Sequence, residues 1–212
     1  MNTEKKLGIL ALVVVVIVIA GIALRPVVQD RTISATVDER IERPELNFSF
    51  VFPSGEDAYS YIEPAFGTSS TEGTPIAAFI MIENDAYIAF QDPSFVGETP
   101  PSMSIFVYKK VKESTTTVVA SDTPRVGRVE ELQNWAQSNS GLTSYALAVG
   151  APEEVSLDGA TAIHYTADGL YQQDIYLAFY KGNYYLIVGQ FNAPTDTIYA
   201  DFQNLVQSIS FI

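Results

Sequence analysis

The chain has 212 residues, with 25 Asp and Glu against 12 Lys and Arg, one His and no Cys, and its net charge is −13. The absence of cysteine excludes disulfides, thiolate zinc sites and cysteine nucleophiles. Such a negative field repels phosphates, so nucleic acid is not an expected partner, whereas cations, basic proteins and neutral glycans stay open. The length beyond the N-terminal segment fits one domain.

The N-terminal segment is apolar over residues 7–24, where 18 apolar or glycine residues follow one another without interruption. A helix of this length, at ~1.5 Å per residue, approaches the ~30 Å hydrocarbon core of a bilayer. Lys5 and Lys6 precede it and favour a cytoplasmic position for residues 1–6. The sequence therefore predicts a single-pass protein of the cell membrane, anchored through residues 7–24, whose C-terminal domain is extracytoplasmic.

A cleaved signal peptide is the alternative for the same segment. Gly21-Ile22-Ala23 offers a small-x-small cleavage site. The apolar region of a signal peptide is usually ~7–15 residues long, however. This run is longer, is rich in Val and Ile, and is followed at once by Arg25-Pro26. These features favour an uncleaved anchor.

Downstream of the anchor, residues 25–44 are charged and show no sustained period, which indicates a stalk. The pattern then changes, because Phe48, Phe50 and Phe52 stand at every second position. This period of two is typical of a strand with one buried face. The globular domain is therefore predicted over 45–212.

The middle of the domain alternates between strand-like and helical patterns. Further strands are expected over 76–83, 87–91 and 103–110, with a tight turn at Asn84-Asp85 between the first two. Residues 126–138 then change to helical spacing, and the only tryptophan, in this segment, lies on the apolar stripe. We expect it to be a core residue.

Two hairpins are predicted in the last third of the chain. Asp158-Gly159 supplies the positive φ of a tight turn before a strand over 160–167. Strands over 171–180 and 184–192 then pair through Lys181-Gly182-Asn183. Both are apolar on each face, as central strands covered on both sides are.

An amphipathic helix is predicted after Asp196. Its apolar residues form one stripe at helical spacing, and they are Ile198, Phe202, Leu205, Val206 and Ile209. We expect this helix to dock on the preceding hairpin, because an uncovered apolar sheet face is rarely tolerated. Phe202 should then be buried, while Gln203 should lie on the polar face.

Together these segments resemble the PsbP-like superfamily. The resemblance spans residues 45–212 and rests on Phe-x-Phe-x-Phe-Pro-Ser-Gly, "VSLDGATAIHYTA", the aromatic hairpin "YLAFYKGNYYLIVGQF" and the closing "LVQSISFI". It implies an α+β fold in which an antiparallel sheet is flanked by helices as an α/β/α sandwich. It also implies a binding or assembly role without an established catalytic centre. No residue-level photosystem-binding motif is present, so no photosynthetic function is carried over.

Aromatic residues offer one candidate binding surface. Five tyrosines surround the predicted hairpin, and they are Tyr171, Tyr176, Tyr180, Tyr184 and Tyr185. Such rings can stack on carbohydrate, although aromatic residues also populate ordinary strands. They are the only candidate ligand-binding residues that the sequence singles out.

Catalytic candidates are few. His164 is the sole histidine, which excludes multi-histidine metal sites, and no Gly-x-Ser-x-Gly element accompanies it. Glu153-Glu154 with Asp158, or Asp168 with Asp174, carry oxygen ligands that suit calcium, but their spacing matches no EF-hand loop. No catalytic residue, metal site or cofactor is therefore predicted.

The sequence is best explained by a membrane-anchored, extracytoplasmic, non-enzymatic module that binds a protein or envelope component. The alternative is a hydrolase or metal-dependent enzyme that uses His164 and acidic residues. The alternative requires a cleft in which His164 meets a Ser, Asp or Glu at hydrogen-bonding distance.

The anchor leads to a direct test. The full-length protein is expected to stay in the membrane pellet after carbonate extraction and to keep its complete mass, because an 18-residue apolar helix remains in the bilayer. Release into the soluble fraction with a new N-terminus near Leu24 would identify a cleaved signal peptide instead.

Overall fold

The computed structural model describes residues 37–55, 58–66, 73–110 and 126–212. Within these ranges no helix has the length and apolar character needed to cross a bilayer. The predicted cytoplasmic residues 1–6 and the predicted anchor at 7–24 lie outside the described residues, so the anchor stays a prediction.

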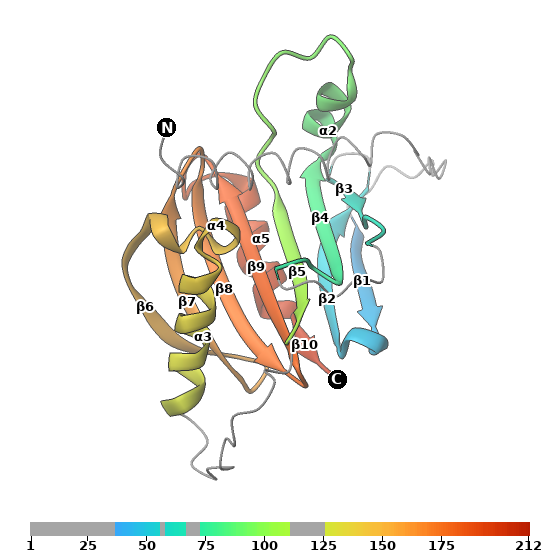
Figure 1. Ribbon diagram of the computed structural model, residues 1–212. Coiled ribbons are helices and arrows are strands. Elements are labelled where there is room, and N and C mark those ends of the chain that lie inside the picture. The colour runs from blue at the N-terminus through green and yellow to red at the C-terminus, as the bar shows by residue number, and fades with distance from the viewer. Residues whose placement is uncertain (1–36, 56–57, 67–72, 111–125) are drawn as a thin grey trace.

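The described residues form an α+β fold built on one mixed sheet of ten strands (Figure 1). In chain order the strands are β1 (Val37–Arg43), β2 (Phe48–Ser54), β3 (Tyr59–Ile62), β4 (Ala77–Glu83), β5 (Met103–Lys109), β6 (Ala148–Leu157), β7 (Ala160–Asp168), β8 (Gln172–Tyr180), β9 (Asn183–Phe191) and β10 (Ser210–Phe211). Their order across the sheet is β1-β2-β3-β4-β5-β9-β8-β7-β6, and β10 pairs with β2.

Four α-helices accompany the sheet in the described part of the chain: α2 (Asn84–Gln91), α3 (Val126–Ser138), α4 (Ser140–Thr143) and α5 (Thr197–Ser208). Two short 3-10 turns, Pro44–Leu46 and Tyr145–Leu147, precede β2 and β6. In Figure 1, α3 and α5 lie on opposite faces of the sheet.

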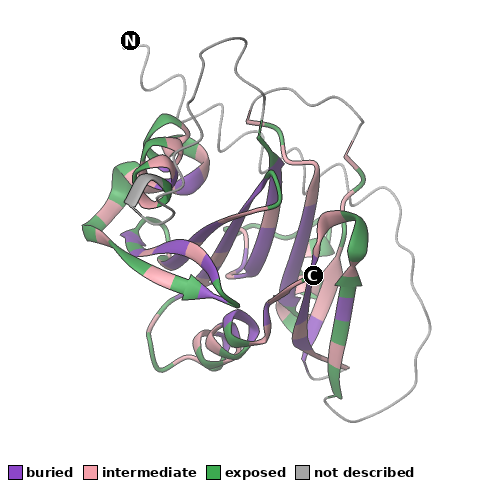
Figure 2. Ribbon diagram, turned by 90° about the horizontal axis from the view of Figure 1, so that it is seen from below, coloured by how far each residue is buried: buried purple, intermediate pink, exposed green. Residues whose placement is uncertain are grey.

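The β8–β9 hairpin forms the middle of the sheet, as the sequence predicts. Its turn at Lys181-Gly182 has φ values of 43° and 86°, the left-handed conformation that a two-residue hairpin turn requires. Successive residues of β9 belong to opposite cores: Tyr185 and Ile187 to one, Tyr184 and Leu186 to the other. The hairpin is therefore buried on both faces (Figure 2).

On one face the cover is α3. Leu132 and Ala136 of this helix are fully buried against β7 and β8. Trp135 is half-buried and stacks on Tyr184, with ring centroids 4.6 Å apart. The predicted packing role of the tryptophan is confirmed, although its ring closes the edge of this core rather than filling its centre.

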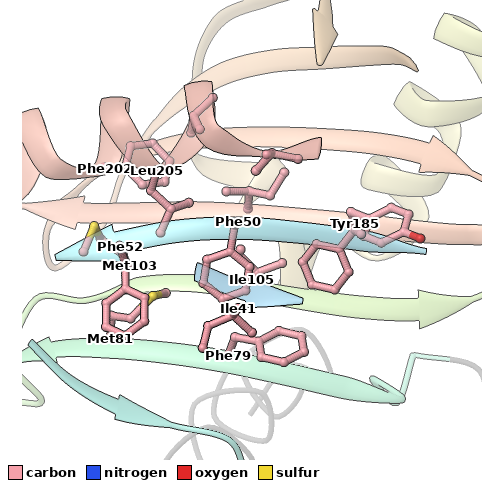
Figure 3. Packing of buried hydrophobic residues seen from close by; sticks show 14 of the residues in the cluster. Ile41, Phe50, Phe52, Phe79, Met81, Met103, Ile105, Tyr185, Phe202 and Leu205 are labelled. Carbon is pink, nitrogen blue, oxygen red and sulfur yellow. The ribbon is translucent and has the colours of Figure 1, made fainter. Parts of the chain in front are cut away.

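The opposite face has a double cover of α5 and β2. Both α5 and the β2 strand pack over β9, and Phe48 of β2 contacts Phe79 of β4 and Tyr185 of β9. These contacts require the sheet to bend back on itself. The bend lies between β2 and β3, which share a single register pair, Ser54 with Tyr59. Figure 3 shows the resulting core between β2, α5 and the main sheet.

The β2–β3 pair is parallel, so the sheet is not wholly antiparallel as expected. The sheet also begins before the predicted domain start at residue 45, because 37–43, assigned to the stalk, forms edge strand β1. Ile41 is the buried hydrophobic residue of β1, and its charged neighbours obscure the strand period.

The predicted strand over 87–91 and its turn at Asn84-Asp85 are wrong, because these residues form α2. Both edges of β4 are already paired, with β3 and with β5, so no position in the sheet is left for another strand there. The Asn84 backbone N–H donates to the carbonyl of Ala58 (3.0 Å) at the start of α2. None of the helix residues is buried.

The terminal helix behaves as predicted, with one exception. Ile198, Phe202, Leu205 and Val206 are buried. Gln203, expected on the polar face, is half-buried and donates a hydrogen bond to Asp174 of β8 (2.6 Å). Gln207, which is exposed, is the better control position on this helix.

Phe202→Ala is expected to lower the free energy of unfolding by about 3–5 kcal/mol, because the ring is fully buried. Gln207→Ala should be nearly silent. A Cβ on Gly189 would lie 2.5 Å from Cγ of Phe202, so Gly189→Ala alone should also destabilise. In the Phe202→Ala background, Gly189→Ala should lower the free energy of unfolding by less than it does in the original chain. Denaturant unfolding of the double variant measures this coupling. Strict additivity would contradict the packing described.

Candidate functional site

The candidate site lies at one end of the sheet, called here the α2 end. Val37, Ser54, Tyr59 and Glu83 are successive register partners on β1 to β4, so they stand in one row at this end. The α2 helix follows Glu83 directly and projects beyond the strands (Figure 1). Consequently the start of β1, the end of β4 and the start of α5 meet there.

Charge is distributed unevenly between the two ends of the sheet. Arg43 and Lys109 close β1 and β5 at the end opposite α2, and Lys181 lies in the β8–β9 turn at that same end. Lys110 and Glu131 form an ion pair there. Among the described residues, none of the lysines or arginines lies at the α2 end.

A groove of about 860 Å³ runs between α2 and α5 at the α2 end. Its polar and charged lining residues are Asp38, Tyr59, Glu83, Asn84, Asp85, Thr197, Asp201, Asn204 and Ser208. A smaller hollow of about 380 Å³ adjoins it through Glu83 and includes Asn192, Thr195 and Asp196. We call the larger one the acidic groove, because the described residues of its lining include four carboxylates and no Lys or Arg.

The walls of the acidic groove are tied together by hydrogen bonds. Tyr59 on β3 donates its hydroxyl to Oδ2 of Asp201 on α5 (2.8 Å). Burial, followed by this hydrogen bond, raises the pKa of Tyr59 above its ordinary value, so the hydroxyl stays protonated and keeps donating. On the other wall, the Asn84 side chain donates to the carbonyl of Gly55. These hydrogen bonds therefore fix the positions of the groove's walls.

The chemistry available in the acidic groove is attraction of positive charge. Among the described lining residues there are four carboxylates and no Lys or Arg, and these carboxylates create a negative potential that a low-dielectric wall strengthens. Among the described residues, no three His, Cys, Asp or Glu side chains come close enough together to hold a metal ion. The lining therefore suits an extended cationic group, such as Lys or Arg side chains, better than a chelated ion.

His164, the catalytic candidate, and Asp174, which was considered as a calcium ligand, do meet. Nε2 of His164 contacts Oδ1 of Asp174, and Gln203 donates to the other carboxylate oxygen at 2.6 Å. Tyr176 stacks on the imidazole, with ring centroids 4.5 Å apart. Asp174 is only 3% exposed, and neither groove is lined by it or by His164. This cluster joins β7 and β8 to α5, with Asp174 buried and His164 half-buried.

The other acidic candidates do not join it. Glu153 pairs with His164 in the β6–β7 register but is exposed, like Glu154 and Asp168. Asp158 accepts a hydrogen bond from the Phe211 backbone N–H (2.6 Å) at the opposite end of the sheet. The acidic residues that were considered as calcium ligands are therefore dispersed.

The five candidate tyrosines lie on more than one surface. Tyr184 and Tyr185 are buried in opposite cores. Tyr176 packs on His164, and Tyr180 stacks on Phe211 at 4.8 Å. Tyr171 donates its hydroxyl to the carbonyl of Thr99 (2.9 Å). The structure does not bring the five rings together as one stacking platform.

The acidic groove itself was not found from the sequence. Asp38, Glu83 and Asp201 come from β1, the end of β4 and α5, so no local spacing connects them. The one signal was the excess of acidic residues over the whole chain.

Comparison with known proteins finds similarity in fold only. No model of a known protein family matches the sequence, and no curated protein does. The solution structure of the cyanobacterial PsbP protein CyanoP from Synechocystis sp. PCC 6803 is similar with a TM-score of 0.46 and 12% identity, over 89% of this chain and 100% of that one. A crystal structure from Bacteroides thetaiotaomicron VPI-5482 has a TM-score of 0.39 and 8% identity, over 82% of this chain and 48% of that one.

Asp174→Ala is expected to lower the free energy of unfolding by about 1–3 kcal/mol, because it leaves Gln203 and His164 without their buried acceptor. Asp168→Ala, on the exposed end of the same β7–β8 turn, is the matched control. Thermal and denaturant unfolding of both variants checks the effect. Equal stability of the two would show that the cluster does not contribute to the fold.

Stability is also expected to fall in alkali. Burial, with a further contribution from Asp174, raises the pKa of Tyr176 to about 12. An unfolded tyrosine ionises near ~10, so the folded state holds this proton to higher pH than the unfolded state. The stabilisation is complete below pH ~10 and is lost as the pH rises towards 12. Unfolding monitored with tyrosinate absorbance tests this, and full ionisation near pH ~10 in a folded protein would contradict it.

Proposed function

We propose that this protein is a membrane-anchored, extracytoplasmic, non-enzymatic module that binds a positively charged segment of a partner protein in the acidic groove. The single observation that carries the proposal is the lining of the groove, in which Asp38, Glu83, Asp85 and Asp201 face a common space and none of the described lining residues is a Lys or Arg.

Electrostatics and exposure together favour a macromolecular ligand. Asp38, Glu83 and Asp85 are exposed, so they are free to steer a basic segment and then to contact it at the rim. The polar and apolar side chains between them, including the half-buried Val51 and the exposed Asn204, supply contact area along the groove. A basic peptide in extended conformation matches this combination of contact area and charge.

The predicted anchor supports the same role. A domain held at the membrane meets membrane-associated partners at a raised effective concentration, so a groove of moderate affinity is sufficient. In this proposal the anchor at 7–24 supplies location and the groove supplies recognition.

A hydrolytic or metal-dependent activity is the second candidate, and the contact between His164 and Asp174 is the observation that favours it. Two features make it the weaker proposal. Both oxygens of Asp174 are already engaged, one by His164 and one by Gln203. The pair also lines neither groove, so a substrate in either one would not reach it.

A labelled oligolysine peptide tests the groove. Fluorescence anisotropy with the full-length chain in neutral detergent should show binding that weakens as salt rises. Glu83→Gln combined with Asp85→Asn should weaken the affinity by roughly 3- to 10-fold, since each exposed charge contributes a modest amount.

The matched control is Glu153→Gln combined with Glu154→Gln, which removes the same charge from exposed positions on β6, outside both grooves. This pair should leave the affinity nearly unchanged. An equal loss in both double variants would mean that the peptide senses only the net charge, and the acidic groove would not be its site.

A further inference from the structure

Apolar side chains are exposed at the tip of the α2 end. Ile88 on α2 is 68% exposed, and Phe95 and Val96 in the following loop are 39% and 97% exposed. None of the eight residues of α2 is buried, although the helix contains Tyr87, Ile88 and Phe90. Soluble surfaces carry single apolar residues without consequence, but three on one projecting element call for a reason.

The tip is an ordered element. The carbonyl of Asp92 accepts the backbone N–H of Phe95 (2.9 Å), and its side chain accepts that of Ser94 (2.7 Å). Phe90 packs edge-to-face on Phe95 with ring centroids 5.7 Å apart. The end of the loop is tied to the sheet, because Tyr171 donates to the carbonyl of Thr99. Val96 is thus presented to the outside by a loop with fixed contacts.

The tip lies at the end of the domain that the chain enters from the predicted anchor. Val37, the first described residue, is in the same row as Glu83, which immediately precedes α2. Only residues 25–36 separate the predicted anchor from Val37. Twelve residues span at most about 40 Å when fully extended, so the α2 end cannot move far from the bilayer.

We propose that Ile88, Phe95 and Val96 insert into the interfacial layer of the bilayer, so that the domain rests on the membrane through its α2 end. This inference rests on the anchor in the proposed function. A tethered domain needs only a weak second contact to hold one orientation, since the anchor has already confined it to the surface.

Charge specifies the kind of lipid. Asp85, Asp92 and Glu98 surround the tip, and no described Lys or Arg lies at this end of the sheet. A basic membrane-binding surface gains affinity from anionic headgroups, whereas this acidic surface loses it. The expected occupant is a zwitterionic lipid surface, and added anionic lipid should weaken the contact.

The absence of cysteine allows a clean test in the full-length protein. Val96→Cys and Ile212→Cys, each labelled with an environment-sensitive fluorophore, are reconstituted into phosphatidylcholine vesicles that contain a lipid-borne quencher. Ile212 is the matched control, because it is also apolar and exposed (50%) but lies at the opposite end, where its backbone N–H donates to Asn47.

The Val96 probe should shift to the blue and lose emission to the quencher, whereas the Ile212 probe should keep the emission of a water-exposed dye. Replacing part of the lipid with phosphatidylglycerol should reduce the blue shift and the quenching of the Val96 probe.

If the chain floats with the vesicles while both probes report water, the inference is overturned, whereas the predicted anchor is supported. A chain that fails to float contradicts the anchor and the inference together. Shielding of Val96 in native membranes only would assign the tip to a protein and overturn the lipid contact.

Discussion

The fold depends on one constraint, the burial of the β8–β9 hairpin on both faces. The side chains on both faces of these strands are apolar, so neither face can be left in water. Each face must therefore be covered by another element. The α3 helix supplies one, with Leu132 and Ala136, and α5 with β2 supplies the other. The second cover brings the ends of α5 and β3 close enough for Tyr59 to bond Asp201. The acidic groove is therefore a consequence of how this core is closed.

The two ends of the sheet differ in their charged and exposed apolar side chains, so the domain is chemically asymmetric along its strands. Cationic side chains such as Lys109 and Lys181 gather at one end, while the carboxylates of the acidic groove, both hollows and the exposed Ile88 and Val96 occupy the other. A ligand of positive charge and an apolar surface beside it would both be met at the α2 end.

The sequence predicted the elements that long apolar patterns define and missed those that depend on competition for a place in the sheet. The alternation in β8 and β9 and the stripe from Ile198 to Val206 correctly identified the central hairpin and its covering helix. The prediction of a strand over 87–91 was wrong because both edges of β4 are already paired, with β3 and with β5. No local sequence pattern reveals this pairing. Among the candidate site residues, His164 and Asp174 proved to be partners, a contact set by the β7–β8 register. The acidic groove joins residues far apart in the chain and could not be anticipated from spacing.

In the proposed function, the α2 end is the surface through which the domain binds its partner. The most direct measurement is site-specific photo-cross-linking of the full-length protein in its native membrane, with the photoreactive residue at Asp85 in the acidic groove or at Lys109 at the far end. A discrete protein adduct that high salt diminishes is expected from position 85, and none from position 109. Adducts formed at position 109 and absent at position 85 would contradict the proposed function.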